Sequence, residues 1–445
     1  MPKKGNFVQK AKTAVDILLF FCYNGFTRFH FCTQGGMMMK KYPYQIGSPV
    51  YDQVLALLRS ALWGEARFPY QPPQDVEWKD IIQELKNQTV QYLVIDLLIR
   101  ERPEKADAYF ASTARATMRL YNLLDVQQAL CRQLSEASIS CAVAKGAAAA
   151  VFYPQPHNRL IGDVDLLVKQ EDFERACQLV SQNADFLGQN DRHTEYRKND
   201  VTVELHRSFS TLPDPQKREL SDRRIFGAID ASETALLDDY SFRCLPHTEH
   251  ALVLLEHISI HLEEGLGLRQ ILDWMMFADK ALDDRVWNAE FAPIVRELGL
   301  ETLAVTVTRM CQMYLGLSNH ITWCSGADEM LCRELMEYVL SQGNFGRKLP
   351  QGSNKAVTIL GATGNLRTFF RLLQHYGCNN WKAISRYPVL KPFAWLYQLI
   401  RYVVQGLRTK HPLRFLQTAT KRAKTKGDFL EALGVRRMSE ECKEP

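Results

Sequence analysis

The sequence lacks several features that would narrow its class. Its 11 cysteines are scattered, odd in number and free of any CxxC pair. A disulfide framework or a zinc ribbon needs paired spacing, so we interpret them as the reduced thiols of a cytosolic protein. Long apolar runs are also missing: segment 17–23 is too short to cross a membrane, and no small-residue cleavage pattern follows it. We therefore expect a cytoplasmic protein without a transmembrane segment.

Acidic residues are absent from 338–427. This stretch carries 16 Lys or Arg, so the overall net charge of +5 leaves −11 for the rest of the chain. Three interpretations remain open: a surface for nucleic acid, a surface for anionic membrane, or a solvated basic face that keeps the protein soluble. The third is favoured, because aromatic residues such as Trp395 and Tyr397 are more typical of a packed core.

The composition indicates a globular protein of two to four domains, with 445 residues, 46% of them apolar and 24% charged. The sequence divides into five regions: a leader at 1–36, a helical region at 37–138, an alternating region at 139–235, a second helical region at 236–345, and a basic, acid-poor helical region with a frayed tail at 346–445. The leader precedes three consecutive methionines and is either non-native or disordered, or else a poorly packed N-terminal arm.

The alternating region predicts an α+β fold. Short strands are expected at 141–144, 163–168, 184–189, 193–198 and 201–207, with helices beginning at Gly146 and near residue 170. These strands are close together in sequence, so a small, mostly antiparallel sheet is expected, flanked by larger all-helical regions.

Three acids stand on the polar faces of two of these strands. Asp163 and Asp165 alternate with Val164, and Glu204 alternates with the apolar residues of VTVELH. If the two strands are neighbours, the three carboxylates converge and repel one another unless a cation lies among them. Hard cations such as Mg²⁺ prefer oxygen ligands, so the pattern indicates metal-assisted phosphoryl or nucleotidyl transfer. The alternative is a sheet edge with hydrated acids.

Basic groups surround these acids. Lys145 is a point charge suited to phosphate, Gly146 opens a helix, and Arg159 lies four residues before Asp163. His206 shares the polar strand face with Glu204, where it would either orient that carboxylate or bond to backbone. Together these residues predict a phosphate site beside the metal site.

The order of these motifs resembles the nucleotidyltransferase superfamily with the DNA polymerase β-type palm. Strand, Lys-Gly, helix, R-x-x-G-D-x-D-L-L-V and a later V-E-L-H are similar to its bacterial branch of uncharacterised members. Lys145-Gly146 stands where other branches have Gly-Gly or Gly-Ser, and Ala147 supplies no hydroxyl. The later LEHISIHLEEGLGLRQILDW resembles the branch's helical half, which packs over the palm and would bring Arg269 or Asp273 to the cleft.

The resemblance implies an enzyme with two Mg²⁺ ions and a nucleoside triphosphate as co-substrate. Asp163 and Asp165 would ligate the metals, Glu204 would be the third carboxylate, and Lys145 and Arg159 would hold phosphates. The nucleoside monophosphate would pass to a hydroxyl of a small molecule, peptide or protein. The alternatives are a non-catalytic protein with a degenerate palm that binds a nucleotide or partner, and, ranked lower, a glycosyltransferase that uses its DxD motif.

Three weaker patterns favour ordinary structure. His257 and His261 have the i, i+4 spacing of zinc ligands but no evident third ligand. Arg269 and Asp273 have the spacing of a simple helical ion pair. The GATG turn at 361–364 lacks the lysine of a phosphate-binding loop, which indicates a plain loop.

Overall fold

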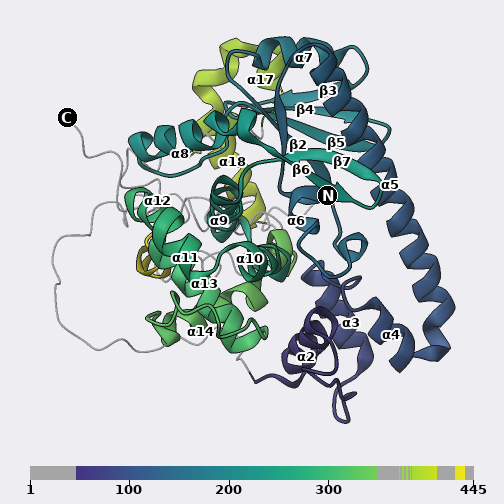
Figure 1. Cartoon of the computed structure of the whole chain (residues 1–445). Helices are drawn as coiled ribbons and strands as arrows, with labels where there is room; N and C mark the ends of the chain where they lie inside the picture. The colour runs from purple at the N-terminus through teal and green to yellow at the C-terminus, as the bar shows by residue number, and fades with distance from the viewer. Residues whose placement is uncertain are drawn as a thin grey trace, which may run out of the picture. The chain divides into compact units, whose positions relative to one another are not determined.

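The chain folds into two compact units in the computed structural model (Figure 1), which describes residues 47–348, 370, 373–374, 377–378, 381, 383–407 and 426–435. The larger unit comprises Lys41–Lys348 with Leu433–Val435, and the smaller unit comprises the remainder. The predicted leader, the GATG turn and most of the basic stretch lie outside the described residues. No helix of the described part is long and apolar enough to cross a membrane.

The larger unit begins with helices and continues into a sheet. The first helices are α2 (Pro49–Trp63), α3 (Trp78–Asn87), α4 (Ile95–Glu101) and α5 (Ala106–Glu136). The strands are β1 (Cys141–Ala144), β2 (Asp163–Val168), β3 (Asp185–Gln189), β4 (His193–Lys198), β5 (Val201–His206), β6 (Glu233–Leu237) and β7 (Tyr240–Cys244). The helices between strands are α6 (Gly146–Ala150), α7 (Phe173–Ser181) and α8 (Pro215–Gly227).

A second group of helices follows the sheet. It consists of α9 (His247–Glu264), α10 (Leu268–Ala281), α11 (Asp284–Val286), a π-helical turn (Trp287–Phe291), α12 (Ala292–Leu298), α13 (Glu301–Tyr314) and α14 (Glu329–Gln342). Short 3₁₀ turns lie at Pro103–Lys105, Pro156–Asn158, Ile229–Ala231 and Asn344–Gly346. The predicted α+β class with flanking helical regions is confirmed.

The seven strands form one open sheet in the order β3-β4-β5-β2-β1-β7-β6. β2 pairs with β5 in parallel and with β1 antiparallel, while β4 pairs antiparallel with both β3 and β5. The predicted strands of the central region are all present, and β2 lies in the middle of the sheet. The two strands that carry the acids are therefore direct neighbours.

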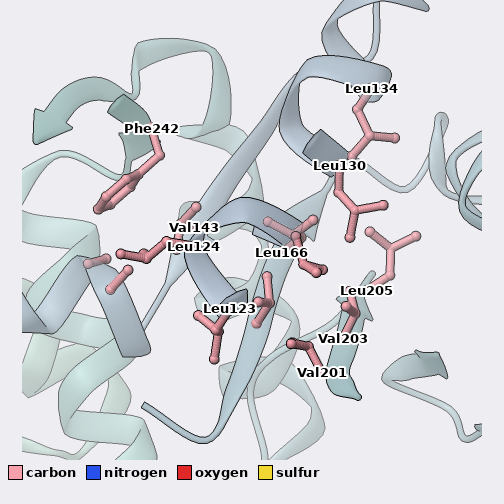
Figure 2. Packing of buried hydrophobic residues seen from close by; sticks show 14 of the residues in the cluster. Leu123, Leu124, Leu130, Leu134, Val143, Leu166, Val201, Val203, Leu205 and Phe242 are labelled. Carbon is pink, nitrogen blue, oxygen red and sulfur yellow. The ribbon is translucent and has the colours of Figure 1, made fainter. Parts of the chain in front are cut away.

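One face of the sheet is covered by α5. Its buried residues Leu120, Leu123, Leu130 and Leu134 recur at three- to seven-residue spacing, which is one stripe of a helix. Figure 2 shows Leu123, Leu130 and Leu134 of α5 beside apolar residues of the strands, which include Leu166 and Leu205. Since side chains alternate along a strand, this packing sends the intervening acids of β2 and β5 to the opposite face.

The sheet extends further along the chain than the sequence pattern predicts. The expectation of helix from about residue 236 is wrong for its first residues, because β6 and β7 form a hairpin that pairs with β1. Asp238 makes the turn with a positive φ of 51°, a conformation that Asp tolerates and that sequence periodicity does not reveal. After this hairpin, α9 starts at His247, directly behind Pro246, and its C-cap is Gly265.

A buried carboxyl group lies between α8 and α9. Glu256 is 1% exposed and accepts a hydrogen bond from Ser221. Burial raises the pKa of Glu256 to about 7, although the hydrogen bond from Ser221 opposes the shift. The neutral acid is therefore the form that the folded protein favours.

Replacing Glu256 with Gln is expected to remove a pH dependence of stability. The pKa rises from 4.5 to about 7 on folding, so the stability that neutral Glu256 contributes is fully present below pH 4.5 and is lost as pH rises through 7. Glu256→Gln and wild type should be about equally stable at pH 4. At pH 8 the variant should be more stable by about 3 kcal/mol, since one pKa unit is worth 1.36 kcal/mol. Urea unfolding across this range measures the difference, and a difference that does not change with pH would contradict it.

The smaller unit is described only in part. It contains α17 (Ala383–Arg386), a 3₁₀ segment (Pro388–Phe393) and α18 (Ala394–Leu407). Trp381 and Tyr397 stack with their ring centroids 4.9 Å apart and their planes 4° from parallel. Both rings are half-buried, and the interpretation of these aromatic residues as core stays a prediction.

Candidate active site

The strand register brings the three acids together. Asp165 of β2 pairs with Glu204 of β5, and Asp163 lies two residues earlier on the same face of β2. Directly paired residues on neighbouring strands share a face. The predicted convergence of Asp163, Asp165 and Glu204 is therefore a consequence of the parallel β2–β5 pairing.

Asp165 is the centre of a hydrogen-bonded group. On the other side of β2, Asp165 pairs with Ala144 of β1, so the next residue, Lys145, leaves the strand beside it. Lys145 Nζ lies 2.8 Å from Asp165 Oδ1, and His206 Nε2 lies 3.0 Å from the same oxygen. His206 Nε2 also lies 3.2 Å from Glu204 Oε2. His206 thus bridges two of the three carboxylates, as the orienting role predicts.

The pKa values of these groups differ in direction. Burial and the neighbouring Asp165 charge raise the pKa of Asp163 to about 6. Burial opposes ionisation of Asp165, but Lys145 and His206 hold its pKa below the usual value. Burial likewise opposes ionisation of Glu204, yet the hydrogen bond with His206 lowers its pKa. Asp163 is therefore the carboxylate whose negative charge is least compensated by protein groups.

The donor atoms fit a divalent cation. Both hydrogen bonds to Asp165 use Oδ1, so among the described residues Oδ2 is the oxygen that a cation can take. Burial and the nearby carboxylates raise the pKa of Asp163, so its negative charge is unfavourable in the folded protein, and a bound cation would stabilise that charge. Oxygen donors from three carboxylates match the preference of Mg²⁺.

His193 is a group that the sequence pattern did not single out. It lies on β4 opposite His206, is 8% exposed, and has its ring centroid 4.9 Å from that of His206. Potential ligand atoms of His193, Glu204 and His206 lie within 4.8 Å of one another. Only the β4–β5 register reveals this proximity, because nothing in the local sequence HTEYRK distinguishes a site histidine.

The Lys-Gly turn has a tightly defined backbone. Lys145 and Gly146 both have positive φ, 52° and 37°. A side chain at Gly146 would put a Cβ 3.3 Å from Ile161 Cγ2, which is close enough to force a shift. The positive φ therefore favours glycine here, and the close Ile161 side chain adds to that preference. The turn aims Lys145 back at Asp165, across the end of β1.

Arg159 is held by a long-range ion pair. Its guanidinium makes a two-point contact with Asp273 of α10, with Nε 3.0 Å from Oδ1, and Tyr153 donates to the same carboxylate at 2.9 Å. Arg159 is 4% exposed and Asp273 is 1% exposed. The expected Arg269–Asp273 pair is therefore wrong, because Arg159 takes Asp273. This contact joins the segment before β2 to the helical part of the unit.

His257 and His261 contact each other. Their Nε2 atoms are 2.9 Å apart, which is a hydrogen-bond distance between two rings. The group of potential ligands found among the described residues does not include them. Their spacing on α9 thus places the two histidine rings in direct contact.

The comparison with protein families matches this part of the chain. A family described as uncharacterised nucleotidyltransferase matches residues 74–316, which is more than half of the chain and includes every site residue above. The chain belongs to this nucleotidyltransferase family. The sequence-based resemblance is therefore confirmed, and the three acids on the adjacent strands β2 and β5 lie within the matched residues.

The other comparisons add less about this nucleotidyltransferase. It is similar to an antigenic nucleotidyltransferase-like protein from Paracoccidioides brasiliensis, with 16% identity over 45% of this chain and 96% of that chain. The TM-score of 0.29 is too low for that likeness to carry an argument. No curated protein matches the chain.

Proposed function

We propose that this protein is a metal-dependent nucleotidyltransferase that moves a nucleoside monophosphate from a nucleoside triphosphate to an acceptor hydroxyl. The observation that carries the proposal is the placement of Asp163, Asp165 and Glu204 on one face of adjacent strands, with Lys145 beside them. This supports an enzyme over a degenerate palm, because buried like charges are costly unless they serve to hold a cation.

The proposed roles follow from the contacts. Asp163 and Asp165 would hold Mg²⁺, which when bound supplies charge neutralisation for the triphosphate and a lower pKa for the attacking hydroxyl. The Gly146 turn and the contact with Asp165 hold Lys145 in place. Its positive charge would bind phosphate oxygens of the nucleoside triphosphate. His206 would keep Asp165 and Glu204 in position through the hydrogen bonds it shares between them.

The reaction would be an in-line displacement. The acceptor oxygen forms a bond to the α-phosphorus, and the bond from that phosphorus to the bridging oxygen breaks, releasing pyrophosphate. Glu204 is ionised at neutral pH because its pKa is lowered, so it is available to accept the hydroxyl proton or to ligate metal. The phosphate-binding role of Arg159 stays a prediction, with its guanidinium engaged by Asp273.

The experiment is a transfer assay with the full chain. Each labelled nucleoside triphosphate is incubated with Mg²⁺ and candidate hydroxyl acceptors, including the protein itself, and products are analysed by mass spectrometry. The expected result is an acceptor heavier by one nucleoside monophosphate, together with released pyrophosphate, both lost when EDTA is added. Nucleotide binding without any transfer across the acceptors would favour the degenerate palm.

A further inference from the structure

Arg269 stands at an unfavourable place for a cation. It is the second residue of α10 (Leu268–Ala281), whose first turn contains no acid. The N-terminus of a helix carries partial positive charge, so a cation there is destabilising unless an anion is close. The position therefore calls for a negative group that the first turn of α10 does not provide.

Asp273, the carboxylate one turn after Arg269, already binds other groups. Asp273, one turn further along α10, is bound by both Arg159 and Tyr153. Within the part of the chain that the structure describes, the buried Nε of Arg269 has no hydrogen-bond partner. Two guanidinium groups thus share one carboxylate, and burial together with the Arg159 charge lowers the pKa of Arg269 to about 10.

The charge of Arg269 influences a carboxyl group of the candidate active site. Arg269 favours ionised Asp163, and Asp163 favours charged Arg269. This electrostatic link connects Arg269 with the acid whose own charge is least compensated.

A rigid turn supports Arg269 from one side. Its guanidinium carbon lies 5.4 Å from the ring centre of Phe345, a cation–π contact. Phe345 is 52% exposed and has a positive φ of 55°, which is strained for an aromatic residue. Its N–H donates to Gly265 at 3.0 Å, and a Cβ at Gly265 would lie 2.1 Å from the backbone nitrogen of Gly346. Close backbone packing thus fixes the ring that holds the guanidinium.

A second unpaired polar atom borders the same ring. His261 is 5% exposed, and its ring centroid lies 4.9 Å from that of Phe345. Its Nε2 contacts His257, whereas its buried Nδ1 has no partner. Burial and the positive charge of Lys145 lower the pKa of His261 to about 3, so the ring is neutral at pH 7 and can donate one hydrogen bond.

We infer that Arg269 and His261, supported by Phe345, form an anion-binding subsite for a polyphosphate chain. The subsite offers a guanidinium, which suits phosphate oxygens, and a neutral imidazole N–H, both beside the Phe345 ring. It supplies donors that the Lys-Gly turn does not. The identification of this chain as the triphosphate of a nucleotide rests on the proposed function.

Binding of inorganic tripolyphosphate to the full-length protein tests the subsite directly. Calorimetry in the presence of Mg²⁺ should show that Arg269→Gln binds tripolyphosphate about 10- to 100-fold more weakly than wild type, as expected for a lost charge-assisted hydrogen bond. Arg269→Lys should recover part of the affinity. Arg119→Gln, an exposed arginine of α5, is the control and should bind as wild type. Arg269→Gln should melt like wild type, because Arg269 makes no hydrogen bond through Nε.

The outcomes separate this subsite from the proposed reaction. Tripolyphosphate affinity that Arg269→Gln leaves unchanged overturns the subsite, even if the wild type transfers nucleotides. Absence of tripolyphosphate binding to the wild type overturns it as well. Binding that depends on Arg269, found in a protein that transfers no nucleotide to any acceptor, supports the subsite and argues against the proposed function alone.

Discussion

Replacing Asp163 with Asn is expected to reduce Mg²⁺-dependent nucleotidyl transfer by about 10³-fold or more, because a metal site contributes several kcal/mol to transition-state stabilisation. Asp163 is the better target of the two β2 acids. Asp165 holds Lys145 and His206 by hydrogen bonds, so its loss would disturb positioning as well as metal binding. Asp163 is the acid with the raised pKa, and a bound cation would stabilise its negative charge.

Asp163→Asn should lower activity without lowering the stability of the fold. The pKa of Asp163 is raised on folding from 3.8 to about 6, so the folded state favours its neutral form and is penalised by its charge as pH rises through 6. In EDTA at pH 8, Asp163→Asn should melt at a temperature equal to or above that of wild type. Asp200→Asn is a matched control in the β4–β5 turn, where a positive φ of 62° suits Asn. Full transfer activity in Asp163→Asn would refute the assignment of this acid to the metal.

The central sheet is predictable from the sequence because apolar and polar residues alternate along its strands. In β2 and β5 the apolar residues Val164, Leu166, Val203 and Leu205 are buried against α5, so the acids between them must share the other face. The convergence of the acids then needs only that the two strands be neighbours. The order of the motifs, which resembles that of the nucleotidyltransferases, agrees with this adjacency of β2 and β5.

Contacts that depend on long-range packing were not predictable. Arg159 and Asp273 are separated by 114 residues, and the local i, i+4 rule assigns Asp273 to the wrong arginine. His193 becomes part of the site only through its register with His206. In both cases the deciding partner comes from another element, which hydrophobic periodicity does not encode.

Breaking the Arg159–Asp273 pair is expected to destabilise the larger unit by about 3–5 kcal/mol, the usual effect of leaving one partner of a buried ion pair without the other. In Arg159→Met the Asp273 carboxylate would remain 1% exposed with only the Tyr153 hydroxyl donating to it. The midpoint of urea unfolding should fall accordingly. Arg333→Met is the matched control, because its i, i+4 pair with Glu337 is exposed on the arginine side and is worth only about 0.5 kcal/mol.

The double variant decides whether charge is the cause. In Arg159→Met/Asp273→Asn neither member of the ion pair is charged, and the Asn carbonyl can still accept from Tyr153. The double variant should therefore be more stable than Arg159→Met alone, although it has lost one more native residue. If instead the two losses simply add, the stabilisation at this position comes from packing rather than from the ion pair.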